Sequence, residues 1–356
     1  MIAVVRPLES TDCEGDLTKL RILVRPHDPK AYDTDWHSRL WRWLESRPLA
    51  DQMHRWVVDA EGEIVGHLAA LPQHHRINGQ QVVAHTPADY MVLPEYGFHA
   101  IALMRKFFRT CDNCVACDTV PAVIGIETGL GAEEAGRLQH AAKLQNVAGL
   151  PALPTSTPAL LTRPFNWGLR AVDRTLGATM FADHSKVEVL GGFDETFDDL
   201  FESVAAGVAC VPEKDAAFLR WRYGPGSPQH PGTVLGVREG ETLLGYAVLN
   251  STADGATGYV LDLTTRPGRR DAARALLHGV VHHFRRLGVH SVRYRLVQSP
   301  SSPQLRDLRR LGFLLSSKRR SSLLVKFADS ALHEIARDIG HWSYSYGDAE
   351  GSYWIT

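Results

Sequence analysis

Hydrophobic and polar positions alternate along the first half of the chain in two different periods. Short runs rich in β-branched and aromatic residues predict strands, and apolar positions three or four residues apart predict helices. Asn78-Gly79 is the strongest two-residue turn signal in the sequence and predicts a hairpin. The expected elements are a strand over 2–6, helices over 14–24 and from 33 to 48, a meander of three strands with turns at 60–63 and 78–79, a helix that ends at 108, a strand over 114–126 and a helix over 132–144.

The stretch from Ala88 to Phe108 joins the last strand of this meander to a helix through only a few residues. The first N–H groups of a helix have no intrahelical partner, and the helix dipole is positive at that end. Both effects favour an anion in front of the helix. The junction therefore predicts a site for an anion, such as the pyrophosphate of a cofactor. A weaker copy of this junction lies at Gly258 to Phe284.

The second half of the chain repeats the order of the first half. A segment rich in proline and small residues, 149–164, ends the first half, and the pattern begins again near Lys186. Four pairs of segments resemble each other: 40–43 with 219–222, 61–71 with 239–249, Asp89-x4-Pro94 with Asp262-x4-Pro267, and 132–144 with 302–313. We therefore expect two copies of one α/β unit. The expected division is a domain over 1–165, a connecting helix and linker over 166–182, and a second domain over 183–356.

Length and composition agree with two soluble domains, because 356 residues are about twice the usual size of one domain. No apolar run approaches the ~20 residues that a membrane-spanning helix needs, and the N-terminus lacks the order of a secretory signal. We therefore expect no membrane association and a cytoplasmic location. The five cysteines do not form a disulfide pattern. Cys111, Cys114 and Cys117 have the spacing of metal ligands but lack a fourth cysteine, so no metal site is expected.

The formal net charge of −1 hides a basic region between Arg266 and Lys326. This region holds fifteen lysines and arginines against two aspartates, a net charge of +13. Such a region is typical of a solvated face, of a site for a phosphate-bearing ligand, or of a nucleic-acid surface. Aromatic residues are not interleaved in the way that stacks bases, so nucleic acid is the less favoured partner but stays open.

Two motifs resemble those of the GNAT superfamily of acyl-CoA-dependent N-acyltransferases: V-x-P-E-Y at Val92–Tyr96, which leads into a helix, and L-x-x-x-G-F at Leu308–Phe313. The resemblance covers nearly the whole chain as a tandem pair. It implies an α/β (α+β) fold in which each domain has a mixed, mostly antiparallel sheet flanked by helices. It also implies acetyl-CoA or another acyl-CoA as co-substrate, with the pantetheine arm on a bulged fourth strand and the pyrophosphate on the next helix. The implied cofactor-binding residues are Met91, Val92, Leu93, Gly97, Phe98, His99, Ala100, Ile101 and Ala102.

Both phosphate loops depart from the Q/R-x-x-G-x-G/A pattern of the superfamily. The aligned residues of the first copy, which lacks the leading Arg or Gln, are Gly97, Ala100 and Ala102. Those of the second copy, which lacks the glycines, are Arg270, Ala273 and Ala275. The tyrosine with which many superfamily members protonate the departing thiolate aligns near Gln139 in the first copy and near Arg309 in the second.

Aminolysis of a thioester requires a base for the proton of the amine and donors for the carbonyl oxygen. Asp89 is a candidate because Asp262 occupies the equivalent position in the second copy, although a duplicated carboxylate is also typical of a structural pair. His85 lies near the place of a basic glutamate in some superfamily members, and histidine titrates in a range that suits a base. Glu127 is expected at the end of a strand, facing the cleft, and completes the predicted catalytic set.

These inferences predict an N-acyltransferase that moves an acyl group, acetyl in the simplest case, from acyl-CoA to an amine of a small molecule. The first copy is expected to carry the chemistry and the second to be a scaffold. Two alternatives stay open. One is a catalytically inactive tandem protein that only binds a ligand or partner, and the other is an aminoacyl-tRNA-dependent transferase of the Fem type that uses the basic region for RNA. The acceptor and the oligomeric state are not predicted.

Overall fold

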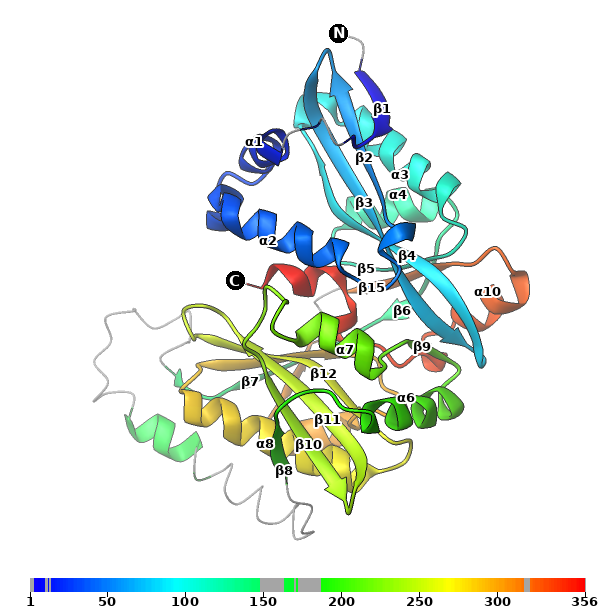
Figure 1. Cartoon of the computed structure of the whole chain (residues 1–356). Coiled ribbons are helices and arrows are strands. Elements are labelled where there is room, and N and C mark those ends of the chain that lie inside the picture. The colour runs from blue at the N-terminus through cyan, green and yellow to red at the C-terminus, as the bar shows by residue number, and fades with distance from the viewer. Residues whose placement is uncertain are drawn as a thin grey trace.

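The computed structural model contains two mixed β-sheets, each with helices on its faces (Figure 1). It describes residues 3–9, 12, 14–147, 163–169, 171, 187–316 and 321–355. The expected α/β class with two tandem mixed sheets is thereby confirmed. The predicted connecting helix over 166–182 is helical as far as residue 169, and the rest of that range, apart from Ala171, lies outside the described residues.

The first sheet is built mainly from the first half of the chain. In spatial order its strands are β1 (Ala3–Pro7), β2 (His54–Ala60), β3 (Glu63–Ile77), β4 (Gln80–Val92), β5 (Cys114–Asp118), β15 (Ser322–Lys326) and β6 (Glu133–Arg137), and β9 (Cys210–Pro212) pairs with the end of β3. Helices α1 (Glu14–Val24) and α2 (Thr34–Glu45) cover one face, and α3 (Phe98–Thr110) and α4 (Pro121–Gly129) cover the other (Figure 1).

The second sheet is built mainly from the second half. In spatial order its strands are β14 (Leu314–Ser316), β7 (Gln139–Leu144), β13 (Ser291–Leu296), β12 (Thr257–Thr265), β11 (Thr242–Ser251), β10 (Thr233–Glu239) and β8 (Val187–Leu190). The helices of this half are α6 (Thr196–Gly207), α7 (Ala216–Tyr223), α8 (Arg270–Leu287), α9 (Leu305–Arg310) and α10 (Ser330–Ala336). Short 3-10 turns end the chain: η5 (Ile339–His341), η6 (Tyr346–Asp348) and η7 (Glu350–Trp354).

The last strand of each half lies in the sheet of the other half. β15 is inserted between β5 and β6, and β7 is inserted between β13 and β14, each antiparallel to both neighbours. The two sheets therefore have equivalent strand orders. In spatial order, β1, β2, β3, β4, β5, β15 and β6 of the first sheet correspond to β8, β10, β11, β12, β13, β7 and β14 of the second. We call residues 3–144 the first unit, residues 187–326 the second unit, and residues 342–355 the C-terminal segment.

Local signals explain several of the element ends. Asn78 and Gly79 have φ angles of 50° and 80°, the left-handed values that a two-residue hairpin turn needs, so the predicted β3–β4 hairpin is confirmed. The side chain of Asp33 accepts a hydrogen bond from Trp36 N at 2.9 Å and caps α2, as its position in the sequence predicts. These caps and turns fix where β4 begins and how α2 approaches the sheet.

Two predicted elements are wrong. The predicted strand over 114–126 ends at Asp118, because Pro121 begins α4. The predicted helix over 132–144 consists of β6 and β7. Alanine, glutamate and leucine favour a helix there, but β15 and β13 supply hydrogen-bond partners from the other half, and this tertiary pairing overrides the local propensity.

The counterpart of residues 302–313 is therefore α4 with the turn after it, and not 132–144. Both helices end in a Leu-Gly pair whose glycine is left-handed: φ is 97° at Gly131 and 81° at Gly312. Glu127 lies three residues before Leu130, as Leu308 lies three residues before Leu311. Gln139, aligned from sequence with the superfamily tyrosine, is instead in β7, and Glu127 corresponds to Leu308, the residue before Arg309.

The two units meet through a reciprocal tryptophan pair. The rings of Trp43 in α2 and Trp221 in α7 stack at a centroid distance of 4.6 Å. Each indole N–H donates to the backbone oxygen of the other residue, at 2.8 and 2.9 Å. The polar edges of both rings are thus satisfied in the interface, as buried tryptophans require.

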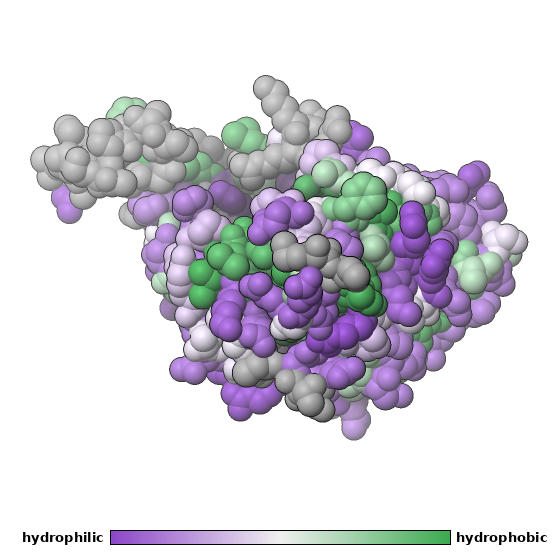
Figure 2. Space-filling view, turned by 90° about the horizontal axis from the view of Figure 1, so that it is seen from above, coloured by the Kyte–Doolittle hydropathy of each residue, from purple (hydrophilic) through white to green (hydrophobic). Residues whose placement is uncertain are grey.

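Among the described residues, no helix is long and apolar enough to cross a membrane. Figure 2 views the molecule from above and shows hydrophobic residues interrupted by hydrophilic ones on that face.

Candidate active site

The strands β4 and β5 diverge at the centre of the first sheet. They share a single paired position, His85 with Cys114, and beyond it no residue of one strand pairs with the other. The gap contains a cavity of about 380 Å³. Its walls come from both units and the C-terminal segment: Arg25, Pro87–Tyr90, Met104, Cys117–Val120, Val123, Arg295, Ser321, Tyr346 and Ala349–Gly351.

A bulge in β4 lies on the wall of this cavity. Met91 pairs with His67 of β3, but Ala88 pairs with Ala69, so β4 carries an extra residue in this interval. Asp89 occupies the bulge with a φ of 49°, a left-handed conformation that costs a non-glycine residue roughly 1–2 kcal/mol. Aspartate is among the residues that tolerate it best. The bulge directs the Asp89 N–H to Glu350 Oε1, at 3.3 Å.

The side chain of Asp89 is ion-paired in the interior. Arg21 Nη2 of α1 lies 2.8 Å from Asp89 Oδ2, and His67 Nδ1 lies 3.3 Å from the same oxygen. Burial opposes ionisation of Asp89, but the charge of Arg21 and the hydrogen bond from His67 outweigh it and hold the pKa of this carboxyl well below its usual range. A carboxylate held this way is a weak base, so the geometry favours a positioning role for Asp89.

Glu350 of η7 is the carboxyl group on the cavity wall with properties that suit proton transfer. Its Oε1 accepts hydrogen bonds from Asp89 N and from Trp354 Nε1. Burial raises the pKa of Glu350 to about 7. Sequence reasoning missed this residue, because 261 positions separate it from Asp89 and no motif surrounds it. Its position depends on how the C-terminal segment packs between the units.

His85 lies away from the cavity, at the paired position that precedes the divergence of β4 and β5. Its Nε2 is 3.0 Å from Gln52 O, and its ring stacks on His54 at 5.9 Å. Burial lowers the pKa of His85. The structure therefore does not bring this candidate together with Asp89 and Glu350.

Glu127 is on α4, and not at the end of a strand as expected. Its side chain is fully buried, at 0 % exposure, and neither carboxyl oxygen has a hydrogen-bond partner among the described residues. Burial, reinforced by the charge of Asp118, raises the pKa of Glu127 to about 8, so the group is protonated at neutral pH. It lies one helical turn after Val123, which lines the cavity.

The predicted phosphate loop forms the start of α3 beyond the end of β4. The turn η3 (Pro94–Tyr96) leads to Gly97, and no side chain caps the helix. Phe98 is 89 % exposed, so the first turn of α3 faces solvent. In the residues before this helix, the side chains of Met91 and Leu93 are buried, and Tyr90 OH donates to Ala100 O at 2.6 Å. The predicted residues 91–93 and 97–102 thus form one continuous strand-to-helix path that begins at the bulge.

The corresponding gap of the second unit is filled by the C-terminal segment. Ser345 forms a bridge with Leu296 of β13, and Val297 N donates to Tyr344 O at 2.7 Å. A Cβ atom on Gly347 would lie 2.2 Å from Tyr223 OH and 2.8 Å from Leu261 O, so the backbone touches the bulge of β12 there. No substrate can occupy the space that this backbone fills.

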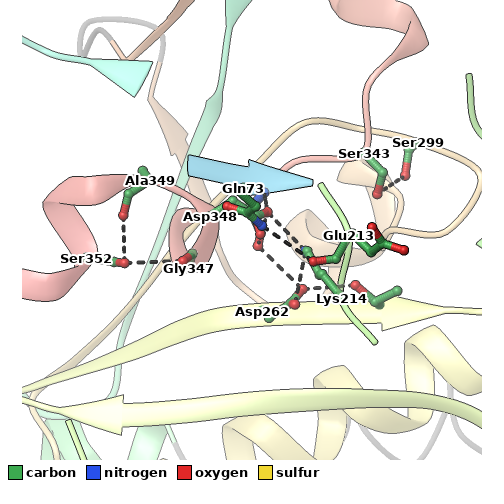
Figure 3. Close-up of polar contacts among 12 residues, drawn as sticks. Gln73, Glu213, Lys214, Asp262, Ser299, Ser343, Gly347, Asp348, Ala349 and Ser352 are labelled. Atoms are coloured by element: carbon green, nitrogen blue, oxygen red, sulfur yellow. Dashed lines mark hydrogen bonds and ion pairs between the residues drawn. The ribbon is translucent and has the colours of Figure 1, made fainter. Parts of the chain in front are cut away.

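A buried ion cluster holds the segment in that gap (Figure 3). Lys214 Nζ lies 3.0 Å from Asp262 Oδ2 and 3.0 Å from Asp348 Oδ2. Tyr246 OH donates to Asp262 at 2.8 Å. Asp262 thus repeats the place of Asp89, while Lys214 and Tyr246 replace Arg21 and His67 as its partners.

The start of α8 corresponds to the start of α3, and its arginines form ion pairs within the second unit. Arg270 Nε and Arg274 Nη2 lie 3.1 and 3.3 Å from the carboxylate of Asp307, and Arg269 pairs with Asp271 at 2.7 Å. Part of the basic region is therefore neutralised within the second unit.

The three closely spaced cysteines do not form a ligand cluster in the structure. Burial raises the pKa of Cys111 to about 12 and that of Cys117 to about 12. Across the described ranges, no group of three His, Cys, Asp or Glu side chains converges in a way that could hold a metal ion.

No protein-family model matches the chain, and the comparison with curated proteins finds no match in sequence. Solved structures do match. A GCN5-related N-acetyltransferase from Anabaena variabilis superimposes with a TM-score of 0.56 at 13% identity, over 93% of this chain and 74% of that one. A GCN5-related N-acetyltransferase from Kribbella flavida gives 0.52 at 15% identity, over 92% and 73%. Saccharomyces cerevisiae N-myristoyltransferase with bound myristoyl-CoA gives 0.55 at 11% identity, over 91% and 77%.

Identities this low establish the fold and nothing finer. The superpositions extend over more than nine tenths of the chain and so include residues of both sheets. The chain has the fold of the GCN5-related N-acetyltransferases, present twice in tandem.

Proposed function

We propose that the protein transfers an acyl group from acyl-CoA to an amine of a small molecule, and that the reaction takes place in the cavity of the first unit. The observation that carries this proposal is the meeting of three features in one gap. These are a bulged strand with an inward N–H, an adjacent carboxyl group whose pKa is about 7, and an uncapped helix start beyond them. Thioester aminolysis requires a donor for the carbonyl oxygen and a base for the amine.

The co-substrate is proposed to follow the path from the bulge to α3. Met91, Val92 and Leu93 would face the pantetheine arm, because β4 has no partner strand on that side beyond His85. The pyrophosphate would meet the free N–H groups at the start of α3, over Gly97 to Ala102. This orientation places the thioester at the bulge, next to Glu350.

In this proposal Glu350 is the general base of the reaction. The ionised carboxylate accepts a proton from the amine as the new C–N bond forms. The C–S bond then breaks, and coenzyme A leaves as a thiolate that must gain a proton. In this proposal the Asp89 N–H, which donates to Glu350 Oε1 in the structure, would donate to the carbonyl oxygen once the thioester is bound, while the pair of Asp89 with Arg21 holds the bulge in shape. A base with a pKa near the working pH is the most effective one.

Glu127 is proposed as the proton source for the thiolate. Its carboxyl is protonated at neutral pH and is not engaged by another described side chain. It also lies next to the position aligned with the superfamily tyrosine, because its counterpart Leu308 directly precedes Arg309. His85 has no part in this proposal, because it lies at the paired position before β4 and β5 diverge, with its Nε2 3.0 Å from Gln52 O. The second unit serves as a scaffold, since its own gap is filled.

Calorimetric titration with acetyl-CoA tests the proposal, together with an assay of thiol release over a panel of amines. Phe98→Glu places a negative charge at the exposed start of α3, where it would repel pyrophosphate while favouring the helix itself. We expect this variant to weaken binding by about tenfold, a typical value for one unfavourable charge at an ion site. Lys106→Gln makes the same change of net charge farther along α3 and should leave the affinity unchanged. Absence of heat with wild-type protein at high concentration would contradict the proposal.

A further inference from the structure

Two arginines line the cavity from different units, and neither forms an ion pair with a carboxylate of the described residues, although the charge of Arg25 acts on Glu350 and by itself lowers the pKa of that group. Arg25 follows the end of α1, and Arg295 is in β13. Each guanidinium rests on an aromatic ring of the C-terminal segment: Arg295 lies 4.2 Å from the ring centre of Tyr346, and Arg25 lies 5.4 Å from that of Trp354. A ring holds one face of a guanidinium and leaves the N–H groups at its edge free to bind an oxyanion.

These arginines are at the reacting end of the cavity and not at the phosphate end. The cavity wall includes the bulge of β4 and Glu350, and none of the residues 97–102 contributes to it. The start of α3 follows the bulge only after the rest of β4 and the turn η3. An anion bound by Arg25 and Arg295 would therefore lie close to the thioester, on a part of the substrates other than the pyrophosphate.

The charges around the cavity indicate a singly charged group. Asp89 is already paired with Arg21, and Asp118 Oδ1 accepts hydrogen bonds from Thr119 N and Val120 N at 2.6 and 2.8 Å. Burial raises the pKa of Glu350 to about 7, so it carries only part of a negative charge at neutral pH. The positive charges of the two arginines exceed the negative charges of Asp118 and the partly ionised Glu350, so the cavity wall carries a small net positive charge. A carboxylate balances this excess better than a doubly charged phosphate does.

We propose that one substrate of the reaction carries a carboxylate and that Arg25 and Arg295 bind it in this cavity. The inference rests on the proposed function and adds the chemical class of the substrate. Guanidinium edges bind carboxylates through paired, charge-assisted hydrogen bonds. The carboxylate can belong to the amine, which would make the acceptor an amino acid or a related amino acid derivative, or it can belong to the acyl chain.

The test compares acids with their uncharged counterparts. Thiol release from acetyl-CoA is measured with glycine, β-alanine and 4-aminobutanoate and with the amide of each. A parallel arm compares succinyl-CoA with acetyl-CoA on an uncharged amine. We expect a preference of at least about tenfold in kcat/KM for the carboxylate form in one arm, because a charge-assisted hydrogen bond is worth about a factor of ten or more. The arm that shows the preference identifies the substrate that carries the group.

Variants then assign the preference to the arginines. Arg25→Gln and Arg295→Gln should each raise KM for the carboxylate form by about tenfold more than they raise KM for the uncharged form. Arg293→Gln is the matched control, because Arg293 is two residues earlier in β13 and does not line the cavity. Equal rates on both forms in both arms would overturn the inference, and so would a preference that the Arg25 and Arg295 variants retain.

Direct binding separates this inference from the proposed function. Calorimetry with 4-aminobutanoate and with succinate requires no acyl transfer. Heat that disappears in the Arg25→Gln, Arg295→Gln double variant would support the carboxylate site even if no acyl-CoA binds. Wild-type protein that neither prefers carboxylate substrates nor binds these two compounds would refute the site, whatever its activity on uncharged amines.

Discussion

The clefts of the two units begin from one strand pattern and differ in what fills them. In the first unit, β4 and β5 pair at a single position and enclose a cavity. In the second unit, β12 and β13 pair from Thr257 to Val260, and the C-terminal segment fills the gap beyond. A buried aspartate with a basic partner lies at the bulge of both strands, Asp89 with Arg21 and Asp262 with Lys214. Both units thus share an ion-paired aspartate at the bulge, but they differ in whether the cleft is open or filled by the C-terminal segment.

This difference gives the filled cleft a use of its own. It anchors the C-terminal segment through Gly347 and Asp348, and the same segment presents Tyr346 and Glu350 to the cavity of the first unit. One cleft binds part of its own chain and thereby completes the other. Four substitutions test this difference between the two clefts.

Lys214→Met is expected to have the largest effect. It leaves the carboxylates of Asp262 and Asp348 buried without a counter-charge, which costs about 3–5 kcal/mol of unfolding free energy. Urea unfolding measures the loss. Lys19→Met is the control, because the Lys19 pair with Asp16 is exposed and is expected to contribute less than about 1 kcal/mol. Similar losses in both variants would show that the cluster does not anchor the segment.

Glu127→Leu gives the first unit the residue that the second unit has at the equivalent position, Leu308. Burial raises the pKa of Glu127 to about 8, above its value in an unfolded chain, so the folded protein favours the protonated form. The protein is therefore most stable below the unfolded pKa and loses stability as the pH rises toward 8. At pH 7 the variant should be more stable than wild type by roughly 3 kcal/mol, with little difference near pH 4.5.

Urea unfolding at the two pH values checks this prediction, with Glu334→Leu on the exposed side of α10 as control. If Glu127 also protonates the thiolate, turnover should fall while stability rises. A variant that is less stable at both pH values would contradict the buried, protonated state of Glu127.

Glu350→Gln removes the base that the filled cleft delivers to the open one. We expect kcat/KM to fall by about 100-fold, a typical contribution of a general base. Because burial raises the pKa of Glu350 to about 7, the wild-type rate should show an upward step with pH near 7, and because burial raises the pKa of the proposed acid Glu127 to about 8, the rate should fall again above about pH 8. The variant should lose this step. Glu334→Gln should keep both the rate and the pH profile, and a variant that keeps the step would exclude Glu350 as the base.

Gly347→Ala is expected to have the smallest of the four effects. The added Cβ would meet Tyr223 OH and the backbone oxygen of Leu261, so the segment must shift, at a cost of about 1–3 kcal/mol. Activity should fall as well, because Glu350 lies three residues later. Gly192→Ala is the control, since a Cβ there meets no atom within 4 Å and Gly192 does not line the cavity. Equal behaviour of the two variants in urea unfolding and thiol release would argue against anchoring through Gly347.

The sequence predicted those parts of the molecule that depend on local patterns. The Asn78-Gly79 hairpin, the Asp33 cap and the strand-to-helix junction after Asp89 each follow from residues next to one another, and the structure contains all three. The repeat was visible for the same reason. The predicted helix over 132–144 failed because its strands pair with β13 and β15, which lie far away in the sequence.

The candidate site shows the same limit. Asp89 was found from its repeat, but its ion pair with Arg21 was not, since no pattern joins α1 to β4 across 68 residues. Glu350 was missed because its raised pKa depends on burial in the folded chain and on the charge of Asp89, which is far away in the sequence. Arg25 and Arg295 were absent from the predicted site because only the folded chain brings them to one cavity.

The exchange of β7 and β15 has a consequence for how the protein folds and unfolds. Removal of either half would withdraw an inner strand from the other half and expose two unpaired strand edges, which promote aggregation. We expect a single cooperative unfolding transition in place of two independent ones, and we expect that neither half folds when it is produced alone. In architecture the chain is a domain-swapped dimer whose two subunits are joined in one polypeptide.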